Sequence, residues 1–401
     1  MGLNDTSSAQ RVHIGFFGRR NSGKSSLVNA VTGQALSVVS DVLGTTTDPV
    51  QKSMELLPIG PVLIIDTPGM DDEGELGQLR VEKTRQILRK TDVAVVVMSA
   101  VKEPSEQEKE LLALLQERKV PTILAVNKID LAFEQDFEKW KHFAPGTAKI
   151  FVSAREKKNI EELKNMIGKL AQTAGAEKPI VSDLVQAGDI VILVTPIDAA
   201  APKGRLILPQ VQTLRELLDR KCLVSCCTTD CLPAMLASMA KAPDLVITDS
   251  QAFRTVHALL PAGCRLTSFS VLFAAFKGDA PFFAESARRL RALPADAKIL
   301  IAEACTHKPL REDIGRVKLP RLLKKVLGDA ITVTVTAGRD FPEDLTPFDI
   351  VIHCGACMFN RAYVMSRVAA CRSAHVPMTN YGMAIAALLG ILDDVAIPGV
   401  D

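Results

Sequence analysis

Eight residues near the start of the chain have the types and the spacing needed to hold the phosphates of a nucleotide. Residues 18–25 read Gly-Arg-Arg-Asn-Ser-Gly-Lys-Ser, which fits the pattern G-x-x-x-x-G-K-[ST] between a strand-like run at 12–17 and a helix-like run at 26–31. In that context backbone N–H groups surround phosphate oxygens, Lys24 reaches the β- and γ-phosphates, and the Ser25 hydroxyl binds Mg²⁺. We interpret this segment as a phosphate-binding loop and not as a surface turn rich in glycine and serine.

Further polar residues follow at the ends of later strand-like runs. Asp66 ends the apolar run 62–65 and can hold Mg²⁺ through water, while Gly69 can give its N–H to the γ-phosphate. Asp130 ends the segment 127–130, which reads Asn-Lys-Ile-Asp. Its carboxylate can accept hydrogen bonds from the N1–H and the exocyclic amine of guanine, two donors that adenine lacks. The order and spacing of these segments predict GTP as the ligand.

Two more segments complete the predicted nucleotide site. In Ser153-Ala154, a backbone N–H can reach the guanine O6, and a threonine of the loop 44–49 could close over the γ-phosphate and complete the Mg²⁺ shell. The expected nucleotide ligands are Asn21, Ser22, Gly23, Lys24, Ser25, Ser26, Thr45, Thr46, Asp66, Thr67, Gly69, Asn127, Lys128, Asp130, Ser153 and Ala154. The residues expected to act in GTP hydrolysis are Lys24, Thr46, Asp66 and Gly69.

Thiols and imidazoles occur at the ends of two other strand-like runs. Cys305-Thr306-His307 follows the run 298–304, and His353-Cys354-Gly355-Ala356-Cys357 follows the run 349–352. Because loops at the carboxyl ends of neighbouring parallel strands share one crevice, Cys305 could meet the pair Cys354 and Cys357 although about fifty residues separate them. C-x-x-C spacing allows two ligands on one metal centre. We therefore predict a metal site.

The residue types leave two metals open for this site. Three thiolates with a weak or absent fourth ligand suit a four-iron cluster, whereas structural zinc prefers a closed set of four ligands. His307 or His353 could close such a set, so spacing alone does not decide. The predicted metal ligands are Cys305, Cys354, Cys357, His307 and His353, with Ser25 on Mg²⁺.

The other cysteines have no standard metal-binding spacing. Cys222, Cys226, Cys227 and Cys231 follow C-x₃-C-C-x₃-C, which is not a zinc pattern. We expect small buried thiols there, with an auxiliary metal or redox role as the alternative. For Cys264 and Cys371 we expect core packing.

Composition limits the classes of function that the chain can have. Hydrophobic residues make up 47% of its 401 residues, enough for sizeable cores, and a formal net charge of +2 provides no general field to attract nucleic acid. No run of about 18 apolar residues is present, so we expect no membrane span. The polar residues 1–11 lack a signal-peptide core, and we expect a cytoplasmic protein with reduced cysteines.

Strand-like and helix-like runs alternate through most of the chain, which indicates an α/β fold with parallel sheets. Residues 171–179 read as a linker. We expect three domains: a P-loop GTPase domain at 1–172, a scaffold and contact domain at 173–275, and a metal-binding domain at 276–401.

Residues 10–172 resemble the Era/TrmE-like branch of the translation-factor-class GTPases. Asn21 stands where potassium-activated members of that branch carry an asparagine that helps to bind a monovalent cation, so the resemblance implies K⁺ as a cofactor. Met70 stands where Ras-like GTPases carry the glutamine that orients water. We therefore expect slow intrinsic hydrolysis, with water positioned by K⁺, by a partner or by a nearby carboxylate. The nearby carboxylates are Asp71, Asp72, Glu73 and Glu75.

The combination of these GTPase motifs with C-x-H and H-C-x-x-C resembles the HydF family of [FeFe]-hydrogenase maturation GTPases over essentially the whole chain. The resemblance implies a middle dimerisation domain, a homodimer, and a [4Fe–4S] cluster on Cys305, Cys354 and Cys357. A fourth ligand would come from His307, His353 or Glu303. It also implies that the protein carries a di-iron precursor made with radical-SAM maturases and delivers it to apo-[FeFe]-hydrogenase.

Two rival functions use the same motifs. One is an RNA- or ribosome-associated Era/TrmE-like GTPase with a structural zinc, and the other is a metal-insertion chaperone for a different enzyme. The near-neutral charge and the absence of a basic patch bearing aromatic residues argue against the RNA-binding alternative.

Overall fold

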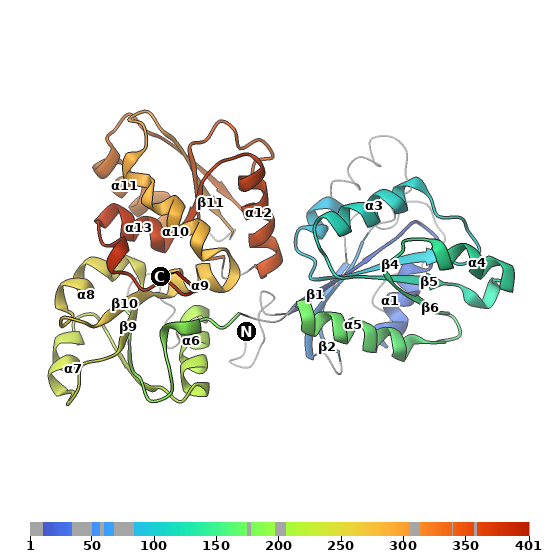
Figure 1. The fold of residues 1–401 in the computed structure, drawn as a ribbon, viewed down its shortest axis with the longest axis horizontal. Helices are drawn as coiled ribbons and strands as arrows, with labels where there is room; N and C mark the ends of the chain where they lie inside the picture. Colours follow the sequence, from blue (N-terminus) through green and yellow to red (C-terminus); the bar gives the residue numbers. More distant parts are fainter. Residues whose placement is uncertain are drawn as a thin grey trace. The chain divides into compact units, whose positions relative to one another are not determined.

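A computed structural model describes residues 11–33, 50–56, 60–67, 84–174, 178–196, 206–304, 313–338, 340–356 and 359–400. The chain divides into two compact units, Met1–Ala176 and Glu177–Asp401. Each unit is described separately below and is drawn in Figure 1.

The N-terminal unit is a six-stranded sheet with the strand order β2-β3-β1-β4-β5-β6. Only β2 runs antiparallel to its neighbour. The strands are β1 Val12–Phe17, β2 Val50–Leu56, β3 Gly60–Asp66, β4 Val93–Ser99, β5 Thr122–Asn127 and β6 Ala148–Phe151. The helices are α1 Lys24–Thr32, α3 Glu106–Glu117, α4 Glu134–His142 and α5 Ile160–Ala174.

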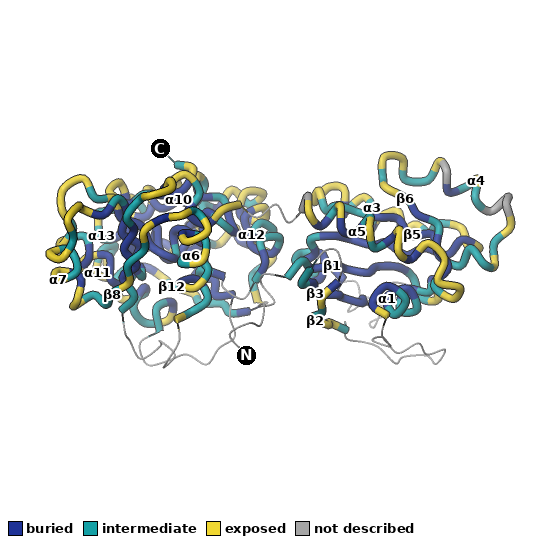
Figure 2. Tube along the Cα trace, turned by 90° about the horizontal axis from the view of Figure 1, so that it is seen from below, coloured by how far each residue is buried: buried dark blue, intermediate teal, exposed yellow. Residues whose placement is uncertain are grey.

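The central strands of this sheet are buried on both faces, as their continuous apolar runs require. Every residue of β4 is buried, and alternate side chains enter two different cores. Helices α1 and α5 cover the core that contains Val95, while α3 and α4 cover the one that contains Val96. In Figure 2 these strands are dark blue between more exposed helices. This packing fixes the strand ends that carry the predicted nucleotide ligands.

The C-terminal unit contains two four-stranded parallel sheets, and we call its two halves the middle module (β7 to α9) and the C-terminal module (α10 to α13). The middle module comprises β7 Ile190–Val194, α6 Leu208–Asp219, β8 Leu223–Cys227, α7 Leu232–Ser238, β9 Leu245–Thr248, α8 Phe253–Leu259, β10 Arg265–Ser268 and α9 Phe269–Lys277. The C-terminal module comprises α10 Ala280–Arg288, β11 Lys298–Glu303, α11 Leu319–Leu327, β12 Thr332–Ala337, β13 Ile350–His353, α12 Arg361–Ser373, β14 Met378–Asn380 and α13 Tyr381–Leu389.

The two modules repeat one topology. The sheet orders are β8-β7-β9-β10 and β12-β11-β13-β14, so each module places its strands as second, first, third, fourth. The residue before the third strand also plays the same part in both. Asp244 Oδ2 accepts a hydrogen bond from the N–H of Ile190 (2.9 Å), and Asp349 Oδ2 accepts one from Lys298 (2.7 Å). These matched contacts make the modules structural repeats.

The registers identify equivalent residues at the strand ends. Val194 pairs with Thr248 in the middle module, and Ala302 pairs with His353 in the C-terminal module. Thr248 is therefore the counterpart of His353. The fourth strands extend the equivalence, because Ser268 pairs with Thr248 and Asn380 pairs with His353.

The last helices of the two modules, α9 and α13, begin with equivalent caps and cross each other. Ser268 Oγ accepts a hydrogen bond from the N–H of Val271 (3.2 Å), and Asn380 Oδ1 accepts one from Met383 (3.0 Å). At the crossing, Ser270 Oγ accepts hydrogen bonds from the Asn380 side chain (3.0 Å) and from the Gly382 N–H (3.1 Å). Both caps satisfy helix N–H groups that would otherwise have no partner.

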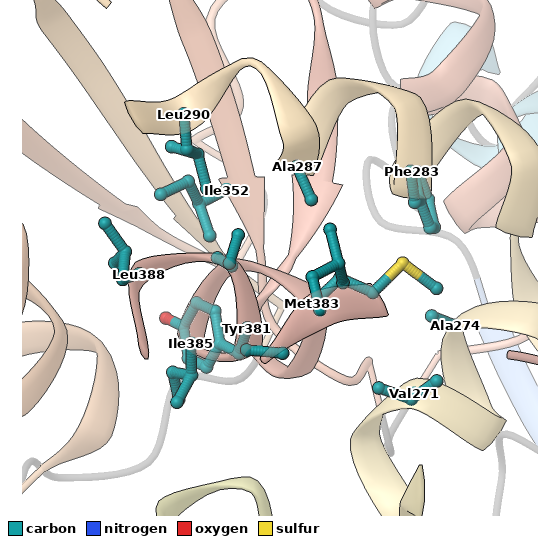
Figure 3. Packing of buried hydrophobic residues seen from close by; sticks show 14 of the residues in the cluster. Val271, Ala274, Phe283, Ala287, Leu290, Ile352, Tyr381, Met383, Ile385 and Leu388 are labelled. Carbon is teal, nitrogen blue, oxygen red and sulfur yellow. The ribbon is translucent and has the colours of Figure 1, made fainter. Parts of the chain in front are cut away.

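Small residues permit this close approach of α9 and α13. A methyl group on Gly382 would lie 3.0 Å from Ser270 Cβ and from Val271 Cγ2. Nearby, Met383 fills the space between Ala274 of α9 and Phe283 of α10 (Figure 3). One hydrophobic core contains residues of both sheets of the unit, and a second core lies within the middle module. The predicted domain boundary at 275/276 stays a prediction.

The predicted fold class is confirmed: a nucleotide-fold sheet is followed by two smaller parallel-sheet modules. Two strands were not predicted, the antiparallel edge strand β2 and the three-residue strand β14. Within the described ranges, no helix has the length and apolar character needed to span a membrane.

Candidate functional site

The predicted phosphate-binding loop connects β1 to α1 through left-handed backbone. Asn21 has a φ of 58° and Gly23, which precedes the helix, a φ of 84°. Gly18 also requires the absence of a side chain, because a Cβ there would lie 2.3 Å from the Val97 carbonyl oxygen. These turns direct the first N–H groups of α1 toward the end of the sheet, the geometry of an anion site at a helix N-terminus.

Three predicted ligands converge at the ends of β1 and β3. Lys24 Nζ lies 2.7 Å from Asp66 Oδ1, and Ser25 Oγ donates to Asp66 Oδ2 at 2.9 Å. Lys24 and Asp66 are buried, at 8% and 7% exposure. An ammonium, a hydroxyl and a carboxylate at one point can bind phosphate and Mg²⁺ together, which is the chemistry predicted for them.

Asn127, at the end of β5, joins the phosphate loop to the predicted guanine site. Its side-chain N–H₂ donates to the carbonyl oxygens of Ser22 (3.1 Å) and Gly23 (3.4 Å), and its Oδ1 accepts from the N–H of Ala154 (3.0 Å). Glycine is needed at position 23 for the Asn127 side chain to fit, because a Cβ there would lie 2.3 Å from Asn127 Nδ2. The buried side-chain amide of Asn127 therefore contacts both the phosphate-binding loop and the predicted guanine site.

The predicted guanine ligands also lie together. Ser153 Oγ donates to Asp130 Oδ1 at 2.7 Å and accepts from the N–H of Glu156 at 3.0 Å. Lys128 has a φ of 66°, which turns the chain between Asn127 and the short helix containing Asp130. The hydroxyl of Ser153 orients the Asp130 carboxylate, the group expected to read guanine.

The remaining predicted nucleotide residues have different positions. Ser26 is a half-buried residue in the first turn of α1, and Thr67 Oγ1 donates to the Phe16 carbonyl oxygen at 2.8 Å. The residues outside the described ranges are Thr45, Thr46, Gly69, Met70, Asp71, Asp72, Glu73 and Glu75.

An ion pair that supports the phosphate loop was not predicted. Arg19 Nε lies 3.1 Å from Glu108 Oε1, and Arg19 also donates to the Glu103 carbonyl oxygen at 2.8 Å. Glu108 belongs to the capping box of α3 with Ser105. The S-x-x-E pattern at 105–108 predicts a helix start, but no sequence signal connects it to the loop.

Cys354 lies at the carboxyl end of β13, beside the end of β11. Its Sγ accepts a hydrogen bond from the N–H of Ala304 at 3.0 Å. Burial raises the pKa of the Cys354 thiol, while N–H groups of Ala304 and Ala356 act in the opposite direction. These N–H groups favour thiolate over thiol and so suit a metal ligand.

The other predicted cluster residues are adjacent in sequence to this point. Ala304 immediately precedes residue 305, and Ala356 immediately precedes residue 357. Cys305, His307 and Cys357 themselves lie outside the described ranges. Among the described residues, no group of three metal-binding side chains is found. Of the three predicted thiolate ligands, Cys354 is the one that the structure describes, and its sulfur lies beside the end of β11 with a backbone N–H donated to it, which suits a thiolate ligand.

His353 is buried in a hydrogen-bonded network. Its Nε2 accepts from Arg367 Nη1 at 2.8 Å, because a guanidinium can only donate, and its Nδ1–H donates to the Cys354 carbonyl oxygen at 2.6 Å. Burial, with the neighbouring Arg367 charge, lowers the pKa of His353 to about 3. Both ring nitrogens therefore have protein partners, and ligation of a metal by His353 would require release of one of them.

Polar groups also surround the other side of Cys354. Glu303 is buried, and its Oε2 accepts from Arg316 Nε at 3.0 Å. The Tyr381 hydroxyl is buried without a hydrogen-bond partner among the described residues. Burial, then the neighbouring Cys354 and Glu303, raises the pKa of Tyr381 well above its ordinary value. A Cβ on Gly315 would lie 2.1 Å from the Tyr381 oxygen, so glycine is required there.

The cysteines outside this site are placed as follows. Cys222 and Cys371 are buried, as predicted for core thiols. Cys226 and Cys231 are exposed, so the expectation of core packing is wrong for these two, which lie on an edge strand and at a helix start. Cys227 and Cys264 are partly buried against the core.

Three family models match successive parts of the chain. Residues 13–128 match the 50S ribosome-binding GTPase family, residues 180–278 match the hydrogen maturase F dimerization domain, and residues 281–398 match the hydrogen maturase F tetramerization domain. The N-terminal unit is therefore a P-loop GTPase domain, and the other two domains are ones that support self-association.

Relatives of known function resemble the GTPase domain. The tRNA modification GTPase MnmE of Clostridioides difficile is 34% identical over 151 residues, covering 37% of this chain and 32% of that protein. GTPase Der of Thermomicrobium roseum is 32% identical over 174 residues, covering 39% of this chain and 37% of that protein. This chain thus spans about a third of the length of the curated relatives it matches.

A solved structure of Aquifex aeolicus Era bound to GDP·AlF₄⁻ has a TM-score of 0.36 and 19% identity, over 54% of this chain and 92% of that one.

The assignment of the chain to a family rests on the family models. Two of them describe hydrogen maturase F, lie in consecutive order after the GTPase domain, and cover both modules of the C-terminal unit. The chain belongs to the hydrogen maturase F family.

Proposed function

We propose that this chain is a GTP-binding and GTP-hydrolysing scaffold or carrier in [FeFe]-hydrogenase maturation. It binds a [4Fe–4S] cluster through Cys305, Cys354 and Cys357, and it delivers the di-iron subcluster precursor to apo-hydrogenase in the cytoplasm. The observation that carries the proposal is the Cys354 thiol, which accepts the Ala304 N–H at the carboxyl end of a parallel sheet in a chain that also has a GTPase domain.

When bound, the cluster would supply an iron with one exchangeable position. The protein's own residues surround that place with hydrogen bonds and charge. The N–H of Ala304 supports the Cys354 sulfur, and the Glu303 carboxylate lies at the end of the adjacent strand. Glu303, His307 and His353 are the candidates for a fourth ligand. Of these, Glu303 is held by Arg316 and His353 by Arg367.

In the GTPase domain, Lys24 and Asp66 are positioned to bind phosphate and Mg²⁺. Hydrolysis is expected to be slow, because Met70 offers no amide to orient water. We propose that K⁺, held with the help of Asn21, stimulates it. Comparing turnover in K⁺ and in Na⁺ for the natural protein and for Asn21→Ala tests this: equal turnover in both salts for the natural protein would contradict K⁺ stimulation.

GTP binding is proposed to act as a switch that orders the loops 44–49 and 69–76 and thereby gates association with partners. A dimer formed through the middle module would transmit the change. Co-purification with the radical-SAM maturases, with GTP and with GDP, measures this directly. Partner capture that does not change between the nucleotides would count against the switch, while the GTP-binding defective variant Lys24→Ala should lose the GTP-dependent part.

The metal itself separates the proposal from its rivals. Anaerobic purification followed by iron, sulfide and zinc analysis should give iron and sulfide in nearly equal amounts, as a [4Fe–4S] cluster requires. Zinc without sulfide would contradict the proposal and favour a structural zinc site.

A further inference from the structure

The buried charges of the C-terminal unit are confined to one place. Among its described residues, the buried charged side chains are Lys277, Glu303 and Arg367, at 4%, 6% and 3% exposure. Arg367 binds His353, and Glu303 ends the strand next to Cys354. Burial of a charge is unfavourable unless hydrogen bonds compensate it. Lys277 is the one of the three that comes from the middle module, at the last turn of α9.

Lys277 reaches across to the loop between β13 and α12, and we call its described residues, 354–356 and 359–360, the cluster loop. Its Nζ donates to the carbonyl oxygens of Ala356 and Phe359, both at 2.9 Å. The Ala356 carbonyl belongs to the peptide bond that leads into residue 357. The ammonium therefore holds the backbone at the centre of the C-x-x-C segment. It also lies 5.6 Å from the centroid of the Phe273 ring, a contact that favours a cation.

The cluster loop has a backbone that needs such support. Ala356 has a φ of 48°, a left-handed conformation that residues with a Cβ seldom adopt. A second contact follows the loop in sequence. Arg361, the first residue of α12, donates hydrogen bonds to the carbonyl oxygens of Phe276 (3.1 Å) and Gly278 (2.9 Å) at the end of α9. Two cations thus join the end of α9 to the chain around the cluster loop: Lys277 donates from α9, and Arg361 donates from the start of α12.

We propose that Lys277 is a positioning residue of the cluster site: it fixes the cluster loop through two carbonyl groups and places a buried positive charge beside the bound cluster. The inference rests on the proposed function and adds to it a contribution from the middle module. A thiolate-bound cluster is anionic and becomes more negative when it is reduced, so a nearby cation stabilises the reduced state. Removal of this charge lowers the reduction potential.

The first measurement uses the full chain without cluster. Lys277→Met keeps the apolar stem and removes both hydrogen bonds and the charge, and Lys277→Arg keeps the charge. We expect hydrogen exchange of the amides of the cluster loop to be roughly tenfold faster in K277M, because two buried hydrogen bonds to its carbonyl groups are lost. In K277R the exchange rate should remain closer to that of the natural protein.

The second measurement uses the reconstituted full chain. In an EPR-monitored redox titration, the ratio of reduced to oxidised cluster at a fixed potential should fall several-fold in K277M and recover in K277R. If K277M acted only through lost packing, the reduced fraction would not recover in K277R because of its positive charge.

Lys318→Met is the matched control for both measurements. Lys318 also joins the two modules, through a 2.8 Å hydrogen bond to Gln251, and the variant changes the net charge equally. If K277M lacks the thermal transition of the natural protein, Lys277→Gln replaces it in both experiments.

Two results in the variant that lacks the Lys277 charge would overturn the inference. One is an unchanged hydrogen-exchange rate in the cluster loop, and the other is an unchanged fraction of reduced cluster. A potential shift of the same size in K318M would also overturn it. A natural chain that takes up no cluster would instead overturn the proposed function, and the exchange experiment would still decide whether Lys277 holds the loop.

Discussion

The middle and C-terminal modules share a strand order, a register and a pair of matched caps, yet they differ in chemistry at the same strand end. In the middle module the third strand ends in Thr248 followed by Asp249, and the Thr248 hydroxyl donates to the Val194 carbonyl oxygen at 3.2 Å. In the C-terminal module the equivalent residues are His353 and Cys354. The two modules place these residues at equivalent strand ends, and the different residue types make one of the two ends a candidate metal site.

The difference extends to the residues around the strand end. Thr248 satisfies its one polar group within its own sheet, whereas His353 needs a buried arginine from α12. The strand end at His353 therefore depends on a buried charge, whereas the equivalent strand end at Thr248 does not. The two strand ends therefore differ in side chains that contact one another across elements. Substitutions at these side chains test the difference, from the largest expected effect to the smallest.

Replacing Arg367 with Leu should destabilise the C-terminal unit by roughly 3 kcal/mol, because His353 Nε2, the Gly338 carbonyl and the Tyr363 hydroxyl each lose a donor. Thr248→Val at the middle module's equivalent strand end should cost about 1 kcal/mol. Denaturant unfolding followed by near-ultraviolet circular dichroism measures both. Equal effects of the two variants would remove the proposed distinction between the modules.

Gly382→Ala should lower the free energy of unfolding by about 2 kcal/mol, although alanine favours helix, because the added methyl group would crowd α9 at 3.0 Å. Ser270→Ala, on the other side of the crossing, adds no atoms and should cost about 1 kcal/mol through its lost hydrogen bonds. A Gly382→Ala variant as stable as the natural protein would show that the two helices separate easily.

His353 should make the cluster-free chain less stable in acid. Its pKa is about 3 in the folded protein and about 6.5 in unfolded chains. The unfolded state therefore binds the proton first, and stability falls by up to about 1.4 kcal/mol per pH unit as the pH drops from 6.5 toward 3. His353→Asn should flatten this dependence between pH 6 and 4 relative to the natural protein, by roughly that slope. An unchanged slope would mean that His353 is accessible to protons when folded.

The matched caps should give the smallest difference. Ser268→Ala removes a helix cap and the 2.8 Å hydrogen bond between the Ser268 and Ser250 hydroxyls, at a cost of about 2 kcal/mol. Asn380→Ala removes a helix cap and two hydrogen bonds to Ser270, and should cost about 1 kcal/mol more. The unfolding midpoints of the two variants measure this. A larger loss in Ser268→Ala would contradict the view that the Asn380 side chain joins the modules.

Features that depend on neighbouring residues in the chain, such as motifs and apolar runs, are predicted well from the sequence. The phosphate loop, Asp66 and residues 127–130 follow fixed spacings, and continuous apolar runs predict the buried strands. The three-residue strand β14 is too short for a periodic pattern to reveal. Lys277 follows an apolar helical run and reads as an ordinary basic residue at a helix end. Its contact with the cluster loop depends on packing between elements about eighty residues apart, which no local pattern contains.

The cysteines show the same limit. Their place in an apolar strand and the loop after it predicts core packing for Cys226 and Cys231, but both are exposed. Cys226 lies on the edge strand β8, and Cys231 lies at the start of helix α7, and neither position can be read from a local pattern. The position of Cys354 beside the end of β11 does follow from sequence order, because the carboxyl ends of neighbouring parallel strands meet at one edge of a sheet.

EPR spectroscopy of the anaerobically reconstituted full chain tests the central claim most directly. It should compare the natural protein with the variant carrying Cys305→Ser, Cys354→Ser and Cys357→Ser, and with a control carrying the same change at Cys226, Cys227 and Cys231. We predict the signal of a reduced [4Fe–4S] cluster in the natural protein and the control, and none in the first variant, with GTP binding retained in all three. A cluster signal that survives in the first variant would contradict the account.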